Sequence, residues 1–169
     1  IEAIVLKTRV KLKFYLNTIS RLAIFLGSQQ VTKTHFEGFR LKNITIPNSV
    51  TKIGEYAFQG CTLLENLEIP DSVTIIDKYA FSKCPKLKHV VLSKNLSKIE
   101  EGLFWQCTSL ESIEIPNVVT EIGAAAFGDC NNLTDVYYSG NEADREEILI
   151  DKTEDLNASL LNATWHYAD

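Results

Sequence analysis

The sequence predicts an α/β repeat protein, a solenoid whose short coils stack on one another and build a parallel β-sheet. A single period is the main observation behind this prediction, because cysteines, phenylalanines and isoleucines each recur every 23 residues. The three series are Cys61, Cys84, Cys107 and Cys130; Phe58, Phe81, Phe104 and Phe127; and Ile53, Ile76, Ile99 and Ile122. Such a period is typical of stacked repeats, in which each unit buries its apolar face only against its neighbours. Because solenoids present extended surfaces to partners, the period favours binding over catalysis.

The second observation is a strand signal inside each unit. In the segment 67–69 an acidic residue, Glu68, lies between two apolar ones, which is the alternation of a half-buried strand. Pro70 cannot donate a hydrogen bond to a β-ladder and therefore ends that strand. The stretch 80–84 is too short for a full helix, and we expect one turn of helix or 3-10 helix that points Phe81 inward.

The repeat divides the chain into three regions. Residues 41–138 carry the 23-residue units, residues 1–40 are expected to form an N-terminal cap with a degenerate coil, and residues 139–169 a small α/β C-terminal cap. In the last region we expect a helix over Glu142–Ile150 and a closing strand. Together they would give the terminal coil the polar cover that a solenoid end needs.

The N-terminal region has a weaker pattern. Val31 matches Val50 as a position in a shortened coil, since the residues that follow each valine are alike. Over residues 6–14 basic and apolar residues alternate as in a strand, whereas the apolar spacing from Leu12 to Leu26 is helical. Either pattern leaves one apolar face, which we expect to cover the first coil.

The cysteine spacing argues against both a disulfide and a zinc site. Zinc sites use close pairs such as Cys-x2-Cys, and the sequence has none. Coils about 4.8 Å apart would bring successive cysteines within disulfide range. However, a buried free cysteine behaves as a small hydrophobic residue. We therefore expect four thiols packed in one internal ladder.

Ten or so positions of the unit recur over four rounds between residue 41 and about residue 138. In one round they are Leu64, Leu67, Ile69, Pro70, Ser72, Val73, Thr74, Ile76, Ala80, Phe81 and Cys84. This unit resembles the repeat of the BspA-like leucine-rich repeat family. The third round departs from the family pattern with Ser93 in place of proline and Leu103 in place of alanine. The tail from Val136 to Tyr167 is similar to the end of bacterial members.

The resemblance implies a leucine-rich-repeat solenoid and a bacterial surface protein, either attached to the cell surface or secreted. It implies adhesion to a host matrix protein, to another cell-surface protein or to a glycan. Secretion is implied by the family alone, since no signal peptide is visible in this chain. We expect a monomer.

Charge and composition exclude several other partners. The net charge is −5, and residues 41–169 carry ten basic against twenty acidic residues. An acidic repeat body argues against nucleic acid, whose phosphates need clustered Lys and Arg. Residues 1–40 are basic and could contact an anionic surface. No run of 18 apolar residues occurs, so we expect no insertion into a membrane.

The outward side of the strands is the predicted binding surface, because side chains between inward residues must point outward. It comprises Asn66, Glu68, His89, Val91, Ser112, Glu114, Asp135 and Tyr137. Trp105 is a further candidate, since its repeat equivalents are polar or glycine, and it either anchors a partner or packs on the adjacent coil. His166 falls in the C-terminal cap, where no partner for it is apparent. The alternative is that these strand residues are ordinary surface residues that contact only solvent and bind no partner.

Two other classes of function stay open. Glu68 and Glu114, about 9.5 Å apart with His89 between them, could act as a carboxylate pair of a carbohydrate-processing enzyme or ligate a metal. A flat strand face offers no closed pocket for such chemistry, and no phosphate-binding or metal-binding motif occurs. We therefore expect no enzyme activity and no cofactor. The second class is a structural spacer that holds another domain of a larger surface protein.

Overall fold

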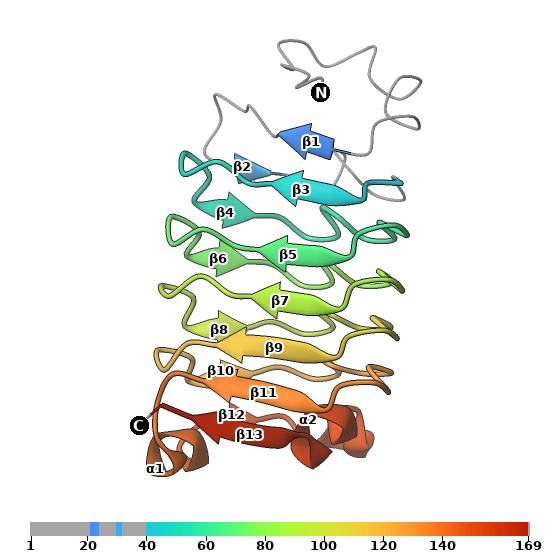
Figure 1. Cartoon of the computed structure of the whole chain (residues 1–169). Helices are drawn as coiled ribbons and strands as arrows, with labels where there is room; N and C mark the ends of the chain where they lie inside the picture. Colours follow the sequence, from blue (N-terminus) through green and yellow to red (C-terminus); the bar gives the residue numbers. More distant parts are fainter. Residues whose placement is uncertain (1–20, 24–29, 32–39, 169) are drawn as a thin grey trace.

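The computed structural model describes residues 21–23, 30–31 and 40–168, and these residues stack as successive coils (Figure 1). One flank carries a five-stranded sheet in which every strand is parallel to its neighbours. In spatial order its members are β5 (Asn66–Glu68), β7 (His89–Val91), β9 (Ser112–Ile115), β11 (Asp135–Tyr138) and β13 (Thr164–Tyr167). On the same flank β3 (Asn43–Thr45) lies next to β5 and pairs with β1 (Arg21–Ala23). The predicted parallel-sheet solenoid is confirmed.

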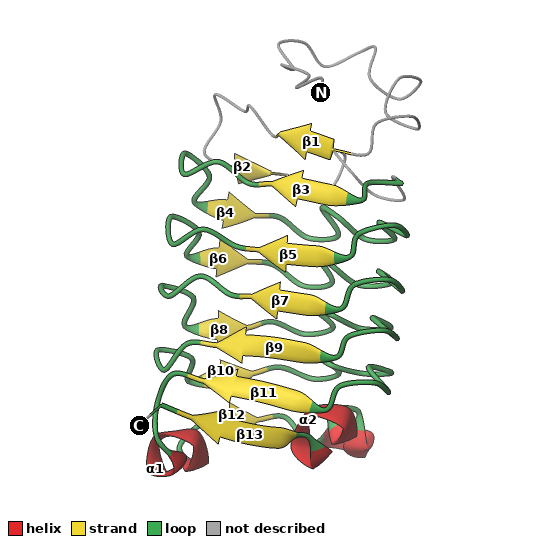
Figure 2. Cartoon of the chain, in the orientation of Figure 1, coloured by secondary structure: helices red, strands yellow, loops and turns green. Residues whose placement is uncertain are grey.

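The opposite flank carries two-residue strands, one from each coil. Figure 2 shows both flanks in yellow with the connecting turns in green. These short strands form two three-stranded parallel sheets, β2-β4-β6 and β8-β10-β12. Their bounds are β2 (Gln30–Val31), β4 (Lys52–Ile53), β6 (Ile75–Ile76), β8 (Lys98–Ile99), β10 (Glu121–Ile122) and β12 (Leu149–Ile150). The apolar core fills the space between the flanks.

The core consists of ladders of equivalent residues. The rings of Phe58 and Phe81 stack with centroids 5.1 Å apart, and the rings of Phe104 and Phe127 with centroids 5.6 Å apart. All four cysteines are buried and none of them forms a disulfide, as their spacing predicted. Each thiol from the second onward donates to the carbonyl of the phenylalanine one coil earlier, at 3.4, 3.2 and 3.2 Å. Burial raises the pKa of Cys130 to about 12 and holds the pKa of Cys107 well above its ordinary value, so these two thiols are packing groups and weak nucleophiles.

The turn of helix or 3-10 helix expected before each cysteine is present only as single turns with the 3-10 hydrogen bond, such as the Cys61 N–H donating to the Phe58 carbonyl at 3.2 Å, and no helix forms there. These stretches are successive hydrogen-bonded turns, and each coil places one residue near the start of the stretch in the left-handed region: φ is 56° at Tyr56, 57° at Tyr79 and 51° at Ala125. A left-handed residue breaks any right-handed helical turn. Alternate amides of the stretch therefore find acceptors in the next coil, as when the Phe58 N–H donates to the Ala80 carbonyl at 2.8 Å.

At the N-terminal end the register corrects two expectations. Val31 is paired with Ile53 and is therefore not the equivalent of Val50. Arg21–Ala23 is a strand, β1, where the apolar spacing had predicted a helix, because pairing with β3 outweighs local periodicity. The strand-like pattern over residues 6–14 lies outside the described residues.

The C-terminal segment adds one longer coil to the stack. It contains α1 (Glu142–Glu146), β12, the 3-10 helix η2 (Thr153–Asp155), α2 (Ala158–Asn162) and β13. The expected helix over Glu142–Ile150 is thus wrong in its second half. Leu149 and Ile150 pair with β10 instead, since that edge of the back sheet is open to another strand.

Asn157 closes the interior of this coil. In the preceding coil the Phe104 N–H donates to the Ala126 carbonyl, 2.8 Å away. The equivalent N–H of Phe127 donates instead to the Asn157 side-chain oxygen at 3.1 Å. The same fully buried side chain donates to the carbonyls of Gly123 and Asp151, at 3.0 and 2.8 Å. The Asn157 side chain thereby supplies the acceptor that a further repeat would have given the Phe127 N–H.

Candidate binding face

The outward side of β5, β7, β9, β11 and β13, which we call the strand face, collects all eight residues that the alternation predicted to point outward. The parallel register aligns them in two columns. The first column is Asn66, His89, Ser112 and Asp135, and the second is Glu68, Val91, Glu114 and Tyr137. Every member of the second column is exposed, whereas the inward neighbours Leu67, Val90, Ile113 and Val136 are buried. The inward and outward assignment made from sequence is therefore correct.

The two glutamates of the second column flank Val91. Glu68 pairs in register with Val91, and Val91 with Glu114, so the two carboxylates lie two strands apart. Neighbouring strands are about 4.8 Å apart, which puts the two Cα positions about 9.6 Å apart. Among the described residues neither carboxylate has an ion-pair or hydrogen-bond partner. Val91, with 36% of its surface exposed, offers an apolar contact between them.

Charges beside the two columns are paired between coils. Lys42 lies 3.5 Å from Glu65, and Lys88 lies 3.2 Å from Glu111, each pair joining one coil to the next. Such exposed pairs neutralise one another and contribute little to stability. The unpaired carboxylates of Glu68 and Glu114 consequently make the centre of the strand face acidic.

His89 belongs to the first column and is held by its neighbours. Its Nδ1 lies 2.8 Å from the Ser112 hydroxyl, and its Nε2 lies 3.9 Å from a Glu111 carboxylate oxygen. The imidazole is thus tied to the strand after its own. This contact links two predicted site residues, His89 and Ser112, whose side chains the sequence could only place in the same column.

The C-terminal end of the strand face contains a residue that sequence reasoning missed. The His166 ring lies on β13, with its Nε2 2.7 Å from a carboxylate oxygen of Asp135. It also stacks on Tyr137, with ring centroids 4.8 Å apart and planes 17° apart. The hydrogen bond from His166, together with the Thr134 hydroxyl, lowers the pKa of Asp135.

The expectation that His166 has no partner is therefore wrong. Its cause is the assignment of residues 139–169 to a separate cap, which hid the pairing of β13 with β11. One signal was available in the sequence: Thr164–Tyr167 repeats the polar and aromatic alternation of Asp135–Tyr138. Aligning the expected closing strand with β11 in this way would have placed His166 beside Tyr137.

Trp105 lies away from the strand face, in the turns that lead from β8 to β9. Its half-buried ring meets Tyr79 edge-on, with centroids 6.4 Å apart, and the Lys83 ammonium lies 5.1 Å from the ring centre. A side chain at Gly128 would come within 2.8 Å of the ring, so the indole occupies space that this glycine leaves open. Of the two interpretations of Trp105, packing on adjacent coils is the one that these contacts favour.

Glu68 and Glu114, which we call the acid pair, and His89 are not enclosed. Catalysis on a sugar or the binding of a metal ion would use a more enclosed site. The His89 ring is directed to Ser112 and Glu111, and both glutamates are exposed strand residues. Within the described part of the chain no three His, Cys, Asp or Glu side chains are placed to hold a metal ion. No described helix has the length and apolar character needed to cross a bilayer.

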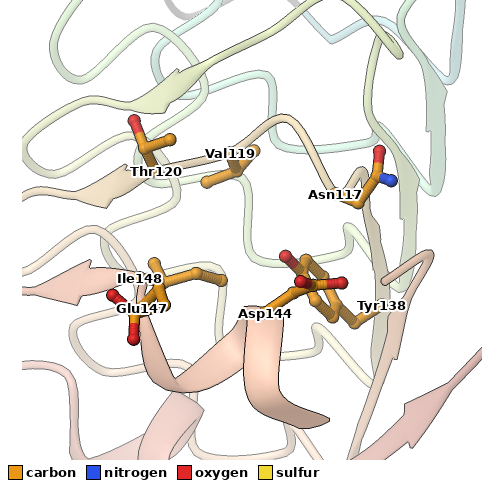
Figure 3. Close-up of a pocket in the computed structure, with 7 residues that line it drawn as sticks. All are labelled: Asn117, Val119, Thr120, Tyr138, Asp144, Glu147 and Ile148. Atoms are coloured by element: carbon orange, nitrogen blue, oxygen red, sulfur yellow. The ribbon is translucent and has the colours of Figure 1, made fainter. Parts of the chain in front are cut away.

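A pocket of about 270 Å³ lies elsewhere, between α1 and the β9–β10 connection (Figure 3). Its lining residues are Asn117, Val119, Thr120, Tyr138, Asp144, Glu147 and Ile148, and none of them belongs to the acid pair. Burial and the nearby Asp144 carboxylate raise the pKa of Tyr138. The pocket therefore lies beside the C-terminal coil, and two carboxylates, Asp144 and Glu147, line it. It contains none of the predicted binding residues, although its Tyr138 belongs to β11, the strand that also carries Asp135 and Tyr137.

Comparison with known proteins identifies the repeat. Residues 29–147 match the BspA type leucine rich repeat region in six copies. A leucine rich repeat protein from T. pallidum is 31% identical, with a TM-score of 0.70 over 86% of this chain and 68% of that chain. A leucine rich cell surface protein from Faecalibacterium prausnitzii is 28% identical, with a TM-score of 0.57 over 76% of this chain and 38% of that chain. A comparison with curated proteins gave no match.

The pneumococcal vaccine antigen PcpA shares the fold, with 19% identity and a TM-score of 0.64. The chain spans about two thirds of the T. pallidum protein and well under half of the F. prausnitzii protein. The structural relatives are bacterial leucine-rich repeat proteins, and the chain shares their parallel-sheet solenoid with little helix. Together with the match over residues 29–147, this shows that the chain belongs to the BspA-type leucine-rich repeat family.

Proposed function

We propose that this chain is a non-catalytic adhesion domain that binds its partner through the strand face. The partner is a host matrix protein, another cell-surface protein or a glycan, and the domain acts as a monomer at the cell surface or after secretion. The observation that carries the proposal is the strand face itself. Five strands present two aligned columns of outward side chains, and the second column is exposed throughout.

The chemistry of the strand face supports binding. It combines unpaired carboxylates at Glu68 and Glu114 with apolar surface at Val91 and Tyr137, and partly exposed aromatic groups are common anchors at interfaces. A location at the cell surface is supported by the name of one relative, a leucine rich cell surface protein. A flat face without a closed pocket suits a macromolecular partner better than a small substrate.

Binding of the purified chain to immobilised matrix proteins and glycans tests the proposal. The matched variant carries Glu68→Lys, Glu114→Lys and Tyr137→Ala, all at exposed positions, and its folding is checked by circular dichroism. We expect the chain to bind at least one member of the panel and the variant to lose that binding. Equal binding by both proteins would place the site away from the strand face.

A spacer role is the second candidate, and one observation favours it. The chain spans only 38% of the F. prausnitzii surface protein, so repeats of this kind occur within longer surface proteins. Failure of both the chain and its variant to bind any member of the panel would favour a spacer. Deletion of the repeats from the complete gene product should then impair an attached domain only when that domain must reach away from the envelope.

A further inference from the structure

We infer that the strand face binds an extended basic segment of its partner in the polyproline II conformation, lying along the axis of the solenoid. Two cations of that segment, three residues apart, pair with Glu68 and Glu114. This inference rests on the proposed function, because it names the chemistry of the partner that the strand face takes.

Charge is the first argument. On the outward strand positions, Asp135 is paired with His166, and His89 lies beside Ser112 and Glu111. Within the described chain, Glu68 and Glu114 have no such partner. Two exposed carboxylates without counter-charges favour a partner that supplies cations, and an anionic partner would be repelled.

Spacing is the second argument. The Cα positions of Glu68 and Glu114 are about 9.6 Å apart, two strand spacings of about 4.8 Å. A polyproline II helix has three residues per turn and rises about 3.1 Å per residue, so residues i and i+3 share a face about 9.3 Å apart. A β-strand repeats one face about every 6.8 Å, and an α-helix about every 5.4 Å. The polyproline II repeat therefore matches the acid pair most closely.

The apolar residues of the same column extend the match. Val91 lies midway between the two glutamates, beneath residues i+1 and i+2 of such a segment. Tyr137 follows one strand after Glu114, at a level between residues i+4 and i+5, which flank the face that carries the cations. Val91 and Tyr137 are 36% and 48% exposed, so prolines at those peptide positions have apolar surface to contact.

Fluorescence anisotropy with three labelled peptides of one composition tests the inference. The matched peptide is Arg-Pro-Pro-Arg-Pro-Pro, with cations three residues apart. The comparison peptides, Arg-Pro-Arg-Pro-Pro-Pro and Arg-Pro-Pro-Pro-Arg-Pro, separate the cations by two and four residues. We expect the matched peptide to bind most tightly and its affinity to fall as salt concentration rises.

Two double variants of the chain locate the contact. Glu68→Gln with Glu114→Gln should weaken binding of the matched peptide by about two- to thirtyfold, the range expected for two exposed ion pairs. Glu142→Gln with Glu146→Gln removes the same charge from exposed positions on α1 and should leave the affinity unchanged. Equal effects of the two variants would overturn the role of the acid pair.

The peptide series tests the polyproline II inference and the binding panel tests the proposed function, so either hypothesis can fail while the other stands. Equal affinity of the three peptides, or no binding at about 1 mM peptide, which means a Kd well above about 1 mM, would overturn the polyproline II inference. If the strand-face triple variant still loses binding to the panel in that case, the proposed adhesion function stands with a different partner. If the triple variant keeps its binding, the proposed function itself fails.

Discussion

Four successive coils each contribute one phenylalanine to a ladder that runs through the core, and each of the two inner rings stacks on a ring at either side. Phe81 is fully buried between Phe58 and Phe104, with centroid distances of 5.1 and 6.1 Å. Outward residues such as Glu68 contact solvent instead. At the scale of single residues, stability is therefore concentrated in the inward positions and binding in the outward ones.

Phe81→Ala should lower the free energy of unfolding by about 3–5 kcal/mol, because it leaves a cavity between two stacked rings. Glu68→Ala should change it by less than about 0.5 kcal/mol. Urea denaturation monitored by circular dichroism measures both values. Similar losses for the two variants would contradict the assignment of Phe81 to the core and Glu68 to the surface.

Ala125→Gly should stabilise the chain by about 0.5–1 kcal/mol. Ala125 has φ = 51°, a left-handed conformation that glycine adopts without the steric strain of a Cβ atom. Ala126→Gly is the control, since Ala126 is fully buried and is not among the left-handed residues. We expect it to destabilise the chain by about 1 kcal/mol. Thermal unfolding of both variants decides, and destabilisation by Ala125→Gly would show that its backbone is unstrained.

At the scale of elements, the coils are joined by hydrogen bonds that run from one turn to the next. The series ends where the Phe127 N–H meets the side chain of Asn157. Asn157 lies between η2 and α2, two elements that are absent from the preceding repeats. At the C-terminal end of the solenoid, the Asn157 side-chain amide thus takes the place of the backbone carbonyl that another coil would supply.

Asn157→Ala should destabilise the chain by about 2–4 kcal/mol, because it removes three hydrogen bonds and leaves the buried Phe127 N–H without an acceptor. Hydrogen exchange should show the largest loss of protection at Phe127. Asn132→Ala, at an exposed position, should change stability by less than about 0.5 kcal/mol. Equal stability of the two variants would mean that Asn157 does not close the last coil.

At the scale of the whole molecule, the repeat body is acidic, with ten basic and twenty acidic residues over 41–169. Several of its carboxylates are stabilised in their ionised form. Hydrogen bonds from Lys78 and Tyr79, at 2.7 and 2.6 Å, lower the pKa of Glu101. His166 does the same for Asp135, and Thr153 for Asp151. These contacts make the stability of the folded chain depend on pH.

The sign of this dependence follows from the lowered pKa values. A carboxyl whose pKa is lower in the folded state contributes stability above its unfolded pKa, and this contribution is lost as the pH falls through the folded pKa. For Glu101 the loss begins near its ordinary value of 4.5 and continues below it. Urea midpoints measured between pH 7 and pH 3 should therefore fall at the acidic end. Glu101→Gln should flatten that fall, and an acidic fall as steep in Glu101→Gln as in the unchanged chain would contradict the assignment.

Most of the fold could be predicted from sequence, whereas only the outline of the site could. Repetition of Phe, Ile and Cys every 23 residues specifies which side chains stack, since a solenoid repeats the same environment in each coil. Alternation along a strand then assigns Glu68 and Val91 to the outside. The contact of His89 with Ser112 depends on side-chain rotamers, which the period does not specify.

The sequence by itself determined the stacked coils, the buried ladders and the two outward columns, because each depends on a pattern that recurs in every repeat. The tertiary structure decided the features that occur once. It limited the predicted helical turns to single turns and bonded alternate amides to the next coil, since a left-handed residue in each coil prevents a helix. It also brought His166 to Tyr137 and Asn157 to Phe127, contacts between residues 29 and 30 positions apart that depend on the path of the irregular last coil.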